Sequence, residues 1–395
     1  MAFENGATSA DPILNSRSGR ARRLATAPTA SSLARPSHHA PNGDFRNPPE
    51  WGSAREQGVL DFFTKALPHW DRSVVFAPEP VQPVDFAALE AGALSGEARV
   101  AAAWIGHVTF VVQSHGARVL TDPLFGERAS PVPFAGPKRF MPAAAQASDL
   151  PAGRALDAVV ISHAHYDHLD AGSVRALLAL RAPPRAWVVP LGLGASLRRW
   201  GAPAARVHEI DWWQGVDVAP ALRITAVPAQ HGSARTPFDR DQTLWCGFWL
   251  RFGGAGTPSP RSVYFAGDTG YRSVEQGAAA GSAEELAAPR CPAFREMRAR
   301  LGAPDLALLP IGAYSPRGFM SSVHASPEDA VRIFEDVGAR SAVAMHFGAL
   351  PLTDEPNGAP AARLAAELAR RGHDARAFVA LRCGETWRES EGPIE

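Results

Sequence analysis

Four side chains of the kinds that bind metal ions stand within six residues, in the run His163-Ala164-His165-Tyr166-Asp167-His168. The preceding residues 158–162 are mostly apolar and branched, a pattern that predicts a buried β-strand. Ligands at the carboxyl end of a strand are held by rigid backbone while their side chains face an open crevice. The first two histidines are two residues apart in extended chain and point the same way, so they can bind one ion together. The aspartate and the last histidine lie in the turn beyond and can reach a second ion.

Three more candidate ligands stand further along the chain, because four ligands do not complete two sites. Each follows an apolar segment that is predicted to be a strand. His231 follows residues 224–230, Asp268 follows residues 263–267, and His346 follows residues 342–345. A single histidine or aspartate in such a position could equally be a capping or core residue. Together with the ligand run at residues 163–168, these three residues predict that several strand ends meet at one metal centre.

The composition excludes several classes of protein. Lys plus Arg and Asp plus Glu number 40 each, so bulk charge does not favour nucleic acid as a partner. The three cysteines, Cys246, Cys291 and Cys383, are few and far apart, which favours a reducing compartment over a disulfide framework. The sequence has no apolar run long enough to span a membrane and no apolar segment typical of a secretory signal. We therefore expect a cytoplasmic protein, with attachment to a membrane surface as the alternative.

Three regions of the sequence differ in composition and in hydrophobic pattern. Residues 1–45 are rich in small and polar residues without a hydrophobic period and are expected to be a disordered tail. Residues 46–98 are expected to be a lead-in segment that packs on the main domain, which covers residues 99–390. Within the lead-in, residues 58–67 predict a short amphipathic helix that ends before a proline. Its apolar face would pack on the core or touch a membrane or lipid.

The main domain begins with strands in close succession, and helices alternate with the later ones. Strands are predicted at residues 100–105, 109–113, 118–121, 158–162, 186–189, 222–227, 244–251, 262–266, 306–310 and 341–345. The clearest helices are predicted at residues 171–180 and 327–337, and Ser326 is expected to cap the second. This order predicts an α/β fold in which two sheets carry helices on their outer faces.

The sequence resembles the metallo-β-lactamase superfamily, whose mark is His-x-His-x-Asp-His. Within it, the chain is similar to the N-acylphosphatidylethanolamine-hydrolysing phospholipase D family over roughly residues 38–390. The residues that carry the likeness include Trp104-Ile-Gly-His-Val-Thr109, Thr121-Asp-Pro-Leu-Phe125, Gly136-Pro-Lys-Arg-Phe140, Ile161–Asp170, Phe265-Ala-Gly-Asp-Thr-Gly-Tyr271, Pro310-Ile-Gly-Ala-Tyr314, Pro327-Glu-Asp-Ala-Val-Arg332 and Met345-His-Phe-Gly348. Two departures are a low-complexity insertion at residues 272–290 and Phe347, which stands where the family usually has tryptophan.

The resemblance implies a four-layer αββα sandwich with two zinc ions per chain, although manganese or iron could occupy a similar site. Carried over residue by residue, it implies that His163, His165 and His231 bind one zinc ion. Asp167, His168 and His346 would bind the other, and Asp268 would bridge the two. The metals would activate a water molecule and polarise the substrate.

Other residues have expected roles around the metals. Asp167 and Asp268 would also act in catalysis by orienting the attacking water, and His324 would bind the phosphate or protonate the leaving group. The alternative for His324 is a surface or capping role. His107 and Asp122 are expected to stand behind the ligands and to orient them, with ordinary turn hydrogen bonds as the alternative.

The leading functional hypothesis is a zinc-dependent phosphodiesterase that cleaves N-acylphosphatidylethanolamine to N-acylethanolamine and phosphatidic acid. One alternative is a hydrolase of the same fold that acts on a lactone or a soluble phosphodiester. Another is a non-enzymatic protein with a decayed site. The presence of all seven proposed ligands argues against this alternative. The expected partner is a phospholipid or another small ester, and the sequence leaves the oligomeric state open, a dimer included.

Overall fold

The computed structural model describes residues 35–54, 74–77, 79–94, 99–275, 277–278 and 282–389. The described residues from Ser37 onward belong to one compact unit, which carries every candidate site residue. Residues 1–34 of the expected tail and the helix expected at residues 58–67 lie outside the described residues.

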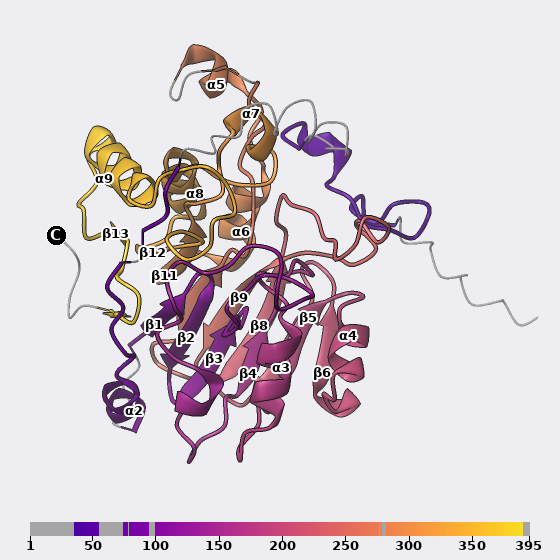
Figure 1. Cartoon of the computed structure of the whole chain (residues 1–395), viewed down its shortest axis with the longest axis vertical. Coiled ribbons are helices and arrows are strands. Elements are labelled where there is room, and N and C mark those ends of the chain that lie inside the picture. Colours follow the sequence, from indigo (N-terminus) through magenta and orange to yellow (C-terminus); the bar gives the residue numbers. More distant parts are fainter. Residues whose placement is uncertain are drawn as a thin grey trace, which may run out of the picture. The chain divides into compact units, whose positions relative to one another are not determined.

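The first sheet has seven strands in the order β14-β1-β2-β3-β4-β5-β6 (Figure 1). They are β1 (Ala101–Gly106), β2 (Thr109–Ser114), β3 (Ala117–Thr121), β4 (Ala158–Val160), β5 (Trp187–Pro190), β6 (Val207–Ile210) and β14 (Thr386–Arg388). β1, β2 and β3 form an antiparallel meander, and β3 to β6 are parallel. Strand β14, close to the end of the chain, pairs antiparallel with β1.

The second sheet also has seven strands, in the order β13-β12-β11-β10-β9-β8-β7. They are β7 (Gly215–Ala219), β8 (Leu222–Val227), β9 (Gly247–Phe252), β10 (Arg261–Phe265), β11 (Leu306–Pro310), β12 (Ser341–Met345) and β13 (Phe378–Val379). Strands β7 to β10 are antiparallel, and β10 to β13 are parallel. The two sheets therefore have the same mixed pattern.

The strands of the first sheet are buried on both faces because alternate side chains enter two different cores. In β4, Val160 belongs to the core shared with the second sheet, whereas Val159 belongs to a cluster on the outer face. Trp104 and Ile105 of β1 divide in the same way. This two-residue alternation explains why these strands are continuous apolar runs in the sequence.

Helices cover the outer face of each sheet, which completes an αββα sandwich as expected. The helices are α2 (Phe86–Leu94), α3 (Ala171–Leu178), α4 (Gly194–Arg199), α5 (Ala283–Ala287), α6 (Ala293–Leu301), α7 (Arg317–Met320), α8 (Pro327–Val337) and α9 (Ala359–Arg371), with 3-10 turns η1 (Pro49–Trp51), η4 (Ala147–Asp149) and η5 (Ala204–Arg206). Helices α3 and α4 pack on the first sheet, and α6, α8 and α9 pack on the second (Figure 1). No helix in the described part of the chain is both long and apolar enough to cross a membrane.

Helix α8 shows how closely local sequence signals set the boundaries. The Ser326 side chain accepts a hydrogen bond from the backbone N–H of Asp329, and Pro327 stands at the first helical position. The helix ends at Gly338, whose φ of 68° is the left-handed conformation that glycine adopts without strain. The helix expected at residues 327–337 is therefore confirmed at both ends.

The short segment from Ser37 to Ala54 lies on the sandwich. The Nε2 atoms of His38 and His39 lie 2.7 and 2.8 Å from the two carboxylate oxygens of Asp211. Phe45 packs against the central core, and the buried Ser53 hydroxyl donates to the Gln230 side chain. The compact unit thus begins before residue 46, where the composition placed the end of the tail. The reason is that two histidines, which composition alone counts as polar, are tied to one carboxylate.

Candidate metal centre

The candidate ligands all follow the carboxyl ends of strands. His107, Asp122 and His163 follow β1, β3 and β4 of the first sheet, and His231, Asp268 and His346 follow β8, β10 and β12 of the second. Within each sheet these strands point the same way, because one antiparallel neighbour separates β1 from β3 and β8 from β10. The side chains therefore collect at one edge of the sandwich, and they come from both sheets.

The first group consists of His163, His165, His231 and Asp268, whose ligand atoms all lie within 4.8 Å of one another. The Nδ1 atom of His165 is 2.8 Å from Nε2 of His163 and 3.3 Å from Nε2 of His231. Three ring nitrogens from two loops thus face one another. The structure brings together the residues that the sequence assigned to the first ion, with the proposed bridging carboxylate beside them.

The second group consists of His107, Asp167, His168 and His346, again within 4.8 Å. Nε2 of His168 lies 3.2 Å from Oδ2 of Asp167, and Nε2 of His346 lies 3.4 Å from the same oxygen. His107, which was expected behind the ligands, contacts Asp167 directly at 2.9 Å. Burial lowers the pKa of His107 to about 3, so its neutral ring donates this hydrogen bond. His107 therefore fixes the orientation of the Asp167 carboxylate.

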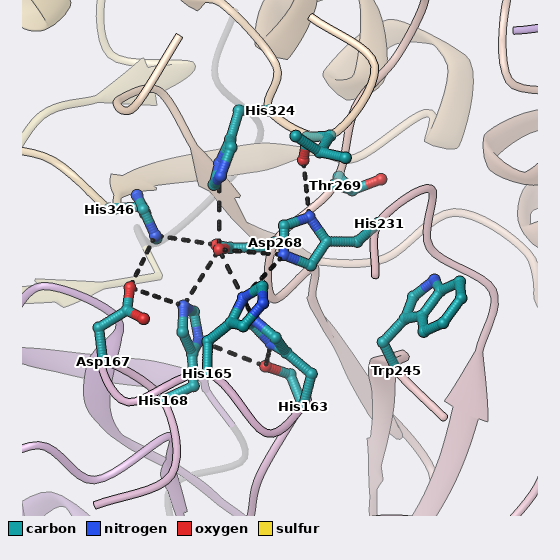
Figure 2. A network of polar contacts seen from close by, with 12 residues as sticks. His163, His165, Asp167, His168, His231, Trp245, Asp268, Thr269, His324 and His346 are labelled. Atoms are coloured by element: carbon teal, nitrogen blue, oxygen red, sulfur yellow. Dashed lines mark hydrogen bonds and ion pairs between the residues drawn. The ribbon is translucent and has the colours of Figure 1, made fainter. Parts of the chain in front are cut away.

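Asp268 lies between the two groups, and the imidazole rings surround its carboxylate (Figure 2). Its Oδ1 is 3.1 Å from Nε2 of His346, and its Oδ2 is 3.1 Å from Nε2 of His168. The same Oδ2 lies 3.8 Å from His163 and 3.7 Å from His231. One carboxylate thus contacts members of both groups, as a bridging ligand requires.

The hydrogen bonds around the first group test whether a cation fits there. Nδ1 of His231 donates to the carbonyl of Val323 at 2.9 Å, so its Nε2 carries a lone pair. Ser162 donates its hydroxyl proton to Asp122 and can accept from Nδ1 of His163 at 3.0 Å, which leaves a lone pair on Nε2 of His163 as well. Two lone pairs that converge on one point repel each other unless a cation lies between them.

Buried atoms with poorly directed contacts support the same conclusion for the second group. Nε2 of His168, Nε2 of His346 and Oδ1 of Asp268 are buried, and despite contacts of 3.1 Å none of them makes a well-directed hydrogen bond among the described residues. Burying polar atoms in such contacts is costly, and a divalent cation would satisfy all of them at once. Imidazole nitrogens with carboxylate oxygens are a donor set that suits zinc, and manganese or iron less selectively. The residues present therefore fit a pair of metal ions.

The charges in the cluster show what a metal ion must displace. Burial alone would lower the pKa of His346, but the carboxylates of Asp268 and Asp167 raise it to about 9. The same carboxylates outweigh burial at His168 and raise its pKa well above the usual value. Burial and the neighbouring imidazoles hold the pKa of His163 well below the usual value. Because metal ligands must be deprotonated, binding at neutral pH must release protons from His168 and His346, and affinity falls as the pH falls.

Asp122 orients His168 from behind. Its Oδ2 lies 2.6 Å from Nδ1 of His168, and it accepts hydrogen bonds from the backbone N–H and the hydroxyl of Ser162. This arrangement points Nε2 of His168 at Asp167 and Asp268. The sequence placed Asp122 behind an expected ligand, and in the structure it contacts His168, one of the candidate ligands.

Replacing Asp122 by asparagine should lower metal affinity by about 10- to 100-fold, because an amide holds the imidazole less strongly and in the wrong tautomer. Competition with a fluorescent zinc chelator measures the change. A variant with Ser196, a half-buried serine of α4 that belongs to neither group of ligands, replaced by alanine serves as the control. Equal affinities for the Asp122→Asn variant and the parent protein would contradict this role.

His324 stands beside the centre but belongs to neither group of four. Its Nδ1 atom is 3.9 Å from Oδ2 of Asp268 and has no hydrogen-bond partner among the described residues. The ring lies 5.1 Å from that of His231 and 5.2 Å from that of His346. Burial lowers its pKa to about 4, although Asp268 opposes the shift. A neutral histidine with a free nitrogen therefore faces the cluster (Figure 2).

Arg235 is a supporting residue that sequence reasoning missed. One guanidinium nitrogen donates to the backbone carbonyls of Ala164 and Leu169, at 2.7 and 2.8 Å. The guanidinium also lies 4.0 Å from the centre of the Tyr166 ring. Through these contacts, Arg235 fixes the position of the loop that carries His163 to His168. It stands four residues after His231, and nothing in the local sequence distinguishes it from a surface arginine.

An αββα sandwich whose strand ends gather six histidines and two carboxylates at one edge defines a metal-dependent hydrolase of the metallo-β-lactamase fold. Comparison with known proteins agrees. The chain belongs to the metallo-β-lactamase superfamily, because a family model described as a beta-lactamase superfamily domain matches residues 117–347.

Among curated proteins, the chain is 36% identical over 303 residues to N-acyl-phosphatidylethanolamine-hydrolyzing phospholipase D 1 of Caenorhabditis elegans. That match covers 75% of this chain and 77% of the relative, so the resemblance seen in the sequence motifs is confirmed. An uncharacterised protein of Mycobacterium tuberculosis is 41% identical over 271 residues. This second match covers 68% of this chain and 64% of that protein, which is less than two thirds of its length.

Among solved structures, an isothiocyanate hydrolase from Delia radicum gut bacteria superposes with a TM-score of 0.52. The alignment covers 73% of this chain and 98% of that protein at 20% sequence identity. Such a likeness concerns the fold alone.

Proposed function

We propose that the protein is a phosphodiesterase of the phospholipase D type, which hydrolyses N-acylphosphatidylethanolamine to N-acylethanolamine and phosphatidic acid. The observation that carries this proposal is the identity of 36% with the Caenorhabditis elegans enzyme over most of both chains. The gathering of all seven expected ligands at one edge of the sandwich supports it.

In this proposal, His163, His165 and His231 hold one zinc ion, and Asp167, His168 and His346 hold the other, with Asp268 shared. When bound, the two ions supply Lewis acidity toward the phosphoryl oxygens and activate water. The chain supplies the rest. Asp167 and Asp268 accept hydrogen bonds and orient the attacking water. The His107 ring keeps Asp167 in place, and the Arg235 guanidinium keeps the ligand loop in place.

A small cavity of about 20 Å³ lies beside the centre. His346 lines this cavity together with Phe140, Phe347 and Leu350, and the polar side chains of Glu355 and Asn357 also belong to its wall. Phe347 is stacked on Trp104, with ring centres 5.0 Å apart, so the aromatic wall is fixed. Because this volume fits about one water molecule, an acyl chain could enter here only if the lining side chains moved, and the lipid proposal rests on the relative.

His324 is assigned the task of binding the phosphate or protonating the leaving group. Replacing His324 by alanine should lower kcat by about 100-fold or more, because the phosphate or the leaving group then loses a positioned hydrogen-bond partner. Replacing it by glutamine should restore part of kcat if the residue acts by hydrogen bonding, and none if it donates the proton. Both variants should keep the metal content of the parent protein, and loss of metal would contradict this role.

The proposed function is tested by incubating purified, zinc-loaded protein with vesicles that contain N-acylphosphatidylethanolamine and following N-acylethanolamine by mass spectrometry. The His163→Ala variant is the control. Product that forms with the parent protein and not with this variant supports the proposal. If product stays at the level of the control while bis(4-nitrophenyl) phosphate is hydrolysed, the centre acts on soluble phosphodiesters and the lipid assignment fails.

A further inference from the structure

A second cavity lies against the outer side of the metal-ligand loop. It has a volume of about 750 Å³, and Tyr166 of the loop forms part of its wall. Trp200, at the end of α4, and Arg235 form another part of the wall. Tyr166 stands between two metal ligands, His165 and Asp167, so the cavity and the metal centre share one segment of chain. A cavity of this size is within the range that binds small ligands.

Three arginine side chains bring positive charge to the cavity wall. Arg128, Arg175 and Arg235 line it from three different segments. None of the three has a carboxylate within 4.0 Å in the described part of the chain. The guanidinium carbons of Arg175 and Arg235 lie 6.0 and 5.5 Å from the centre of the same Trp200 ring. Two cationic groups are thus held beside one aromatic side chain without a carboxylate to neutralise them.

The acidic residues in the cavity wall already have hydrogen-bond or ion-pair partners other than the cavity arginines. Asp170 caps α3 by accepting hydrogen bonds from the backbone N–H and the hydroxyl of Ser173, each at 2.7 Å. Glu127 is mostly exposed and lies 3.4 Å from the Lys138 ammonium group. The charge of Asp170 still acts on Arg235, which also donates to two backbone carbonyls. With three arginines against two carboxylates, the cavity wall keeps a net positive charge.

We propose that this cavity, which we call the arginine cleft, binds a phosphate monoester. A phosphate monoester carries about −1.5 to −2 charges at pH 7 and three acceptor oxygens, which match three guanidinium groups on different sides. One planar guanidinium group can bind two such oxygens at once, which an ammonium group does not do. The cleft is separate from the metal ligands and binds its anion whichever ester the centre cleaves.

The source of the anion rests on the proposed function. Phosphatidic acid, the second product of that reaction, is a phosphate monoester, whereas the substrate is a diester with one charge less. Tyr166 in the wall of the arginine cleft is next in sequence to His165 and Asp167, two of the proposed metal ligands. It would therefore accept the product headgroup, or the headgroup of phosphatidic acid already present in a membrane. Soluble glycerol 3-phosphate offers the same chemistry without acyl chains.

Titration calorimetry of the zinc-loaded protein with glycerol 3-phosphate at fixed ionic strength tests the cleft. The Arg128→Gln/Arg175→Gln variant should bind about tenfold more weakly, because two charge-assisted contacts are lost. Arg251→Gln, an exposed arginine of β9, is the matched control and should stay within about twofold. Since Arg128 also donates to the carbonyl of Gly136, Arg175→Gln alone is measured too, and it should weaken binding in the same direction.

A second arm uses phosphatidylcholine vesicles with and without phosphatidic acid. Binding that requires phosphatidic acid and is lost in the double variant supports the lipid source. Binding of glycerol 3-phosphate with the same arginine dependence supports the soluble source. Equal binding by the parent and the double variant in both arms would overturn the proposal, as would no binding in either arm. Because no turnover is needed, arginine-dependent binding without cleavage of N-acylphosphatidylethanolamine would refute only the proposed function.

Discussion

Replacing Asp268 by alanine is expected to lower kcat/KM for phosphodiester hydrolysis by about a thousandfold or more and to reduce the metal content. The two oxygens of this carboxylate lie 3.1 Å from His346 and from His168, and one of them also faces the first group of ligands. Its loss removes a ligand from both groups at once. It also removes the negative charge that offsets the surrounding imidazoles.

The measurements for Asp268→Ala are metal content by plasma mass spectrometry and kcat/KM with bis(4-nitrophenyl) phosphate. Asp157→Ala is the matched control. Asp157 is also buried, and it accepts from the backbone N–H of Arg118 at the amino end of β4, away from the ligands. This variant should lose some stability but keep its metal. If both variants retained metal and activity equally, Asp268 would not be a bridging ligand.

Replacing Asp329 by alanine is expected to lower the free energy of unfolding by about 3–5 kcal/mol. Asp329 and Arg272 are both fully buried, with 3.2 Å between Nε of Arg272 and Oδ1 of Asp329. Arg317 contacts the other oxygen of Asp329 and also lies 3.2 Å from Glu285 of α5. Without the aspartate, the completely buried Arg272 guanidinium has no carboxylate in contact among the residues that the structure describes. An uncompensated buried charge costs far more than the pair itself contributes.

Urea unfolding followed by circular dichroism measures this loss. Glu296→Ala is the control, because Glu296 forms an exposed ion pair with Arg300 on α6 and its removal should change the free energy of unfolding by about 0.5 kcal/mol or less. Asp329→Asn should lose less than Asp329→Ala, since the amide keeps a hydrogen-bond acceptor. Similar midpoints for Asp329→Ala and Glu296→Ala would show that the buried arginines find other partners.

The layers of the fold could be predicted from the sequence because strands leave a local pattern. Residues 222–227, 306–310 and 341–345 are strands with the expected bounds, and their two-residue alternation is visible without any tertiary contact. The candidate ligands could be proposed because they follow such strands, and the structure brings them together. β6, β7, β13 and β14 were missed, since they are short or only half-buried and carry little apolar signal.

What could not be predicted depends on residues that meet only in the folded chain. The pairing of Asp211 with His38 joins positions 173 residues apart, and composition had placed His38 in a tail. Arg272 falls at the start of a segment that seemed a low-complexity insertion, yet it is fully buried against Asp329. Likewise, no local pattern marks Arg235 as the residue that ties down the ligand loop. Long-range ion pairs leave no periodic trace in a single sequence.

The order of the ligands along the chain has a consequence for biosynthesis. The first group of four is complete once residue 268 has been made, whereas the second lacks a member until residue 346 has left the ribosome. In a nascent chain, the first ion could therefore be captured before β12 exists. The second ion would bind only after His346 has also been translated. The two groups of ligands would then be completed in a fixed order, the first before the second.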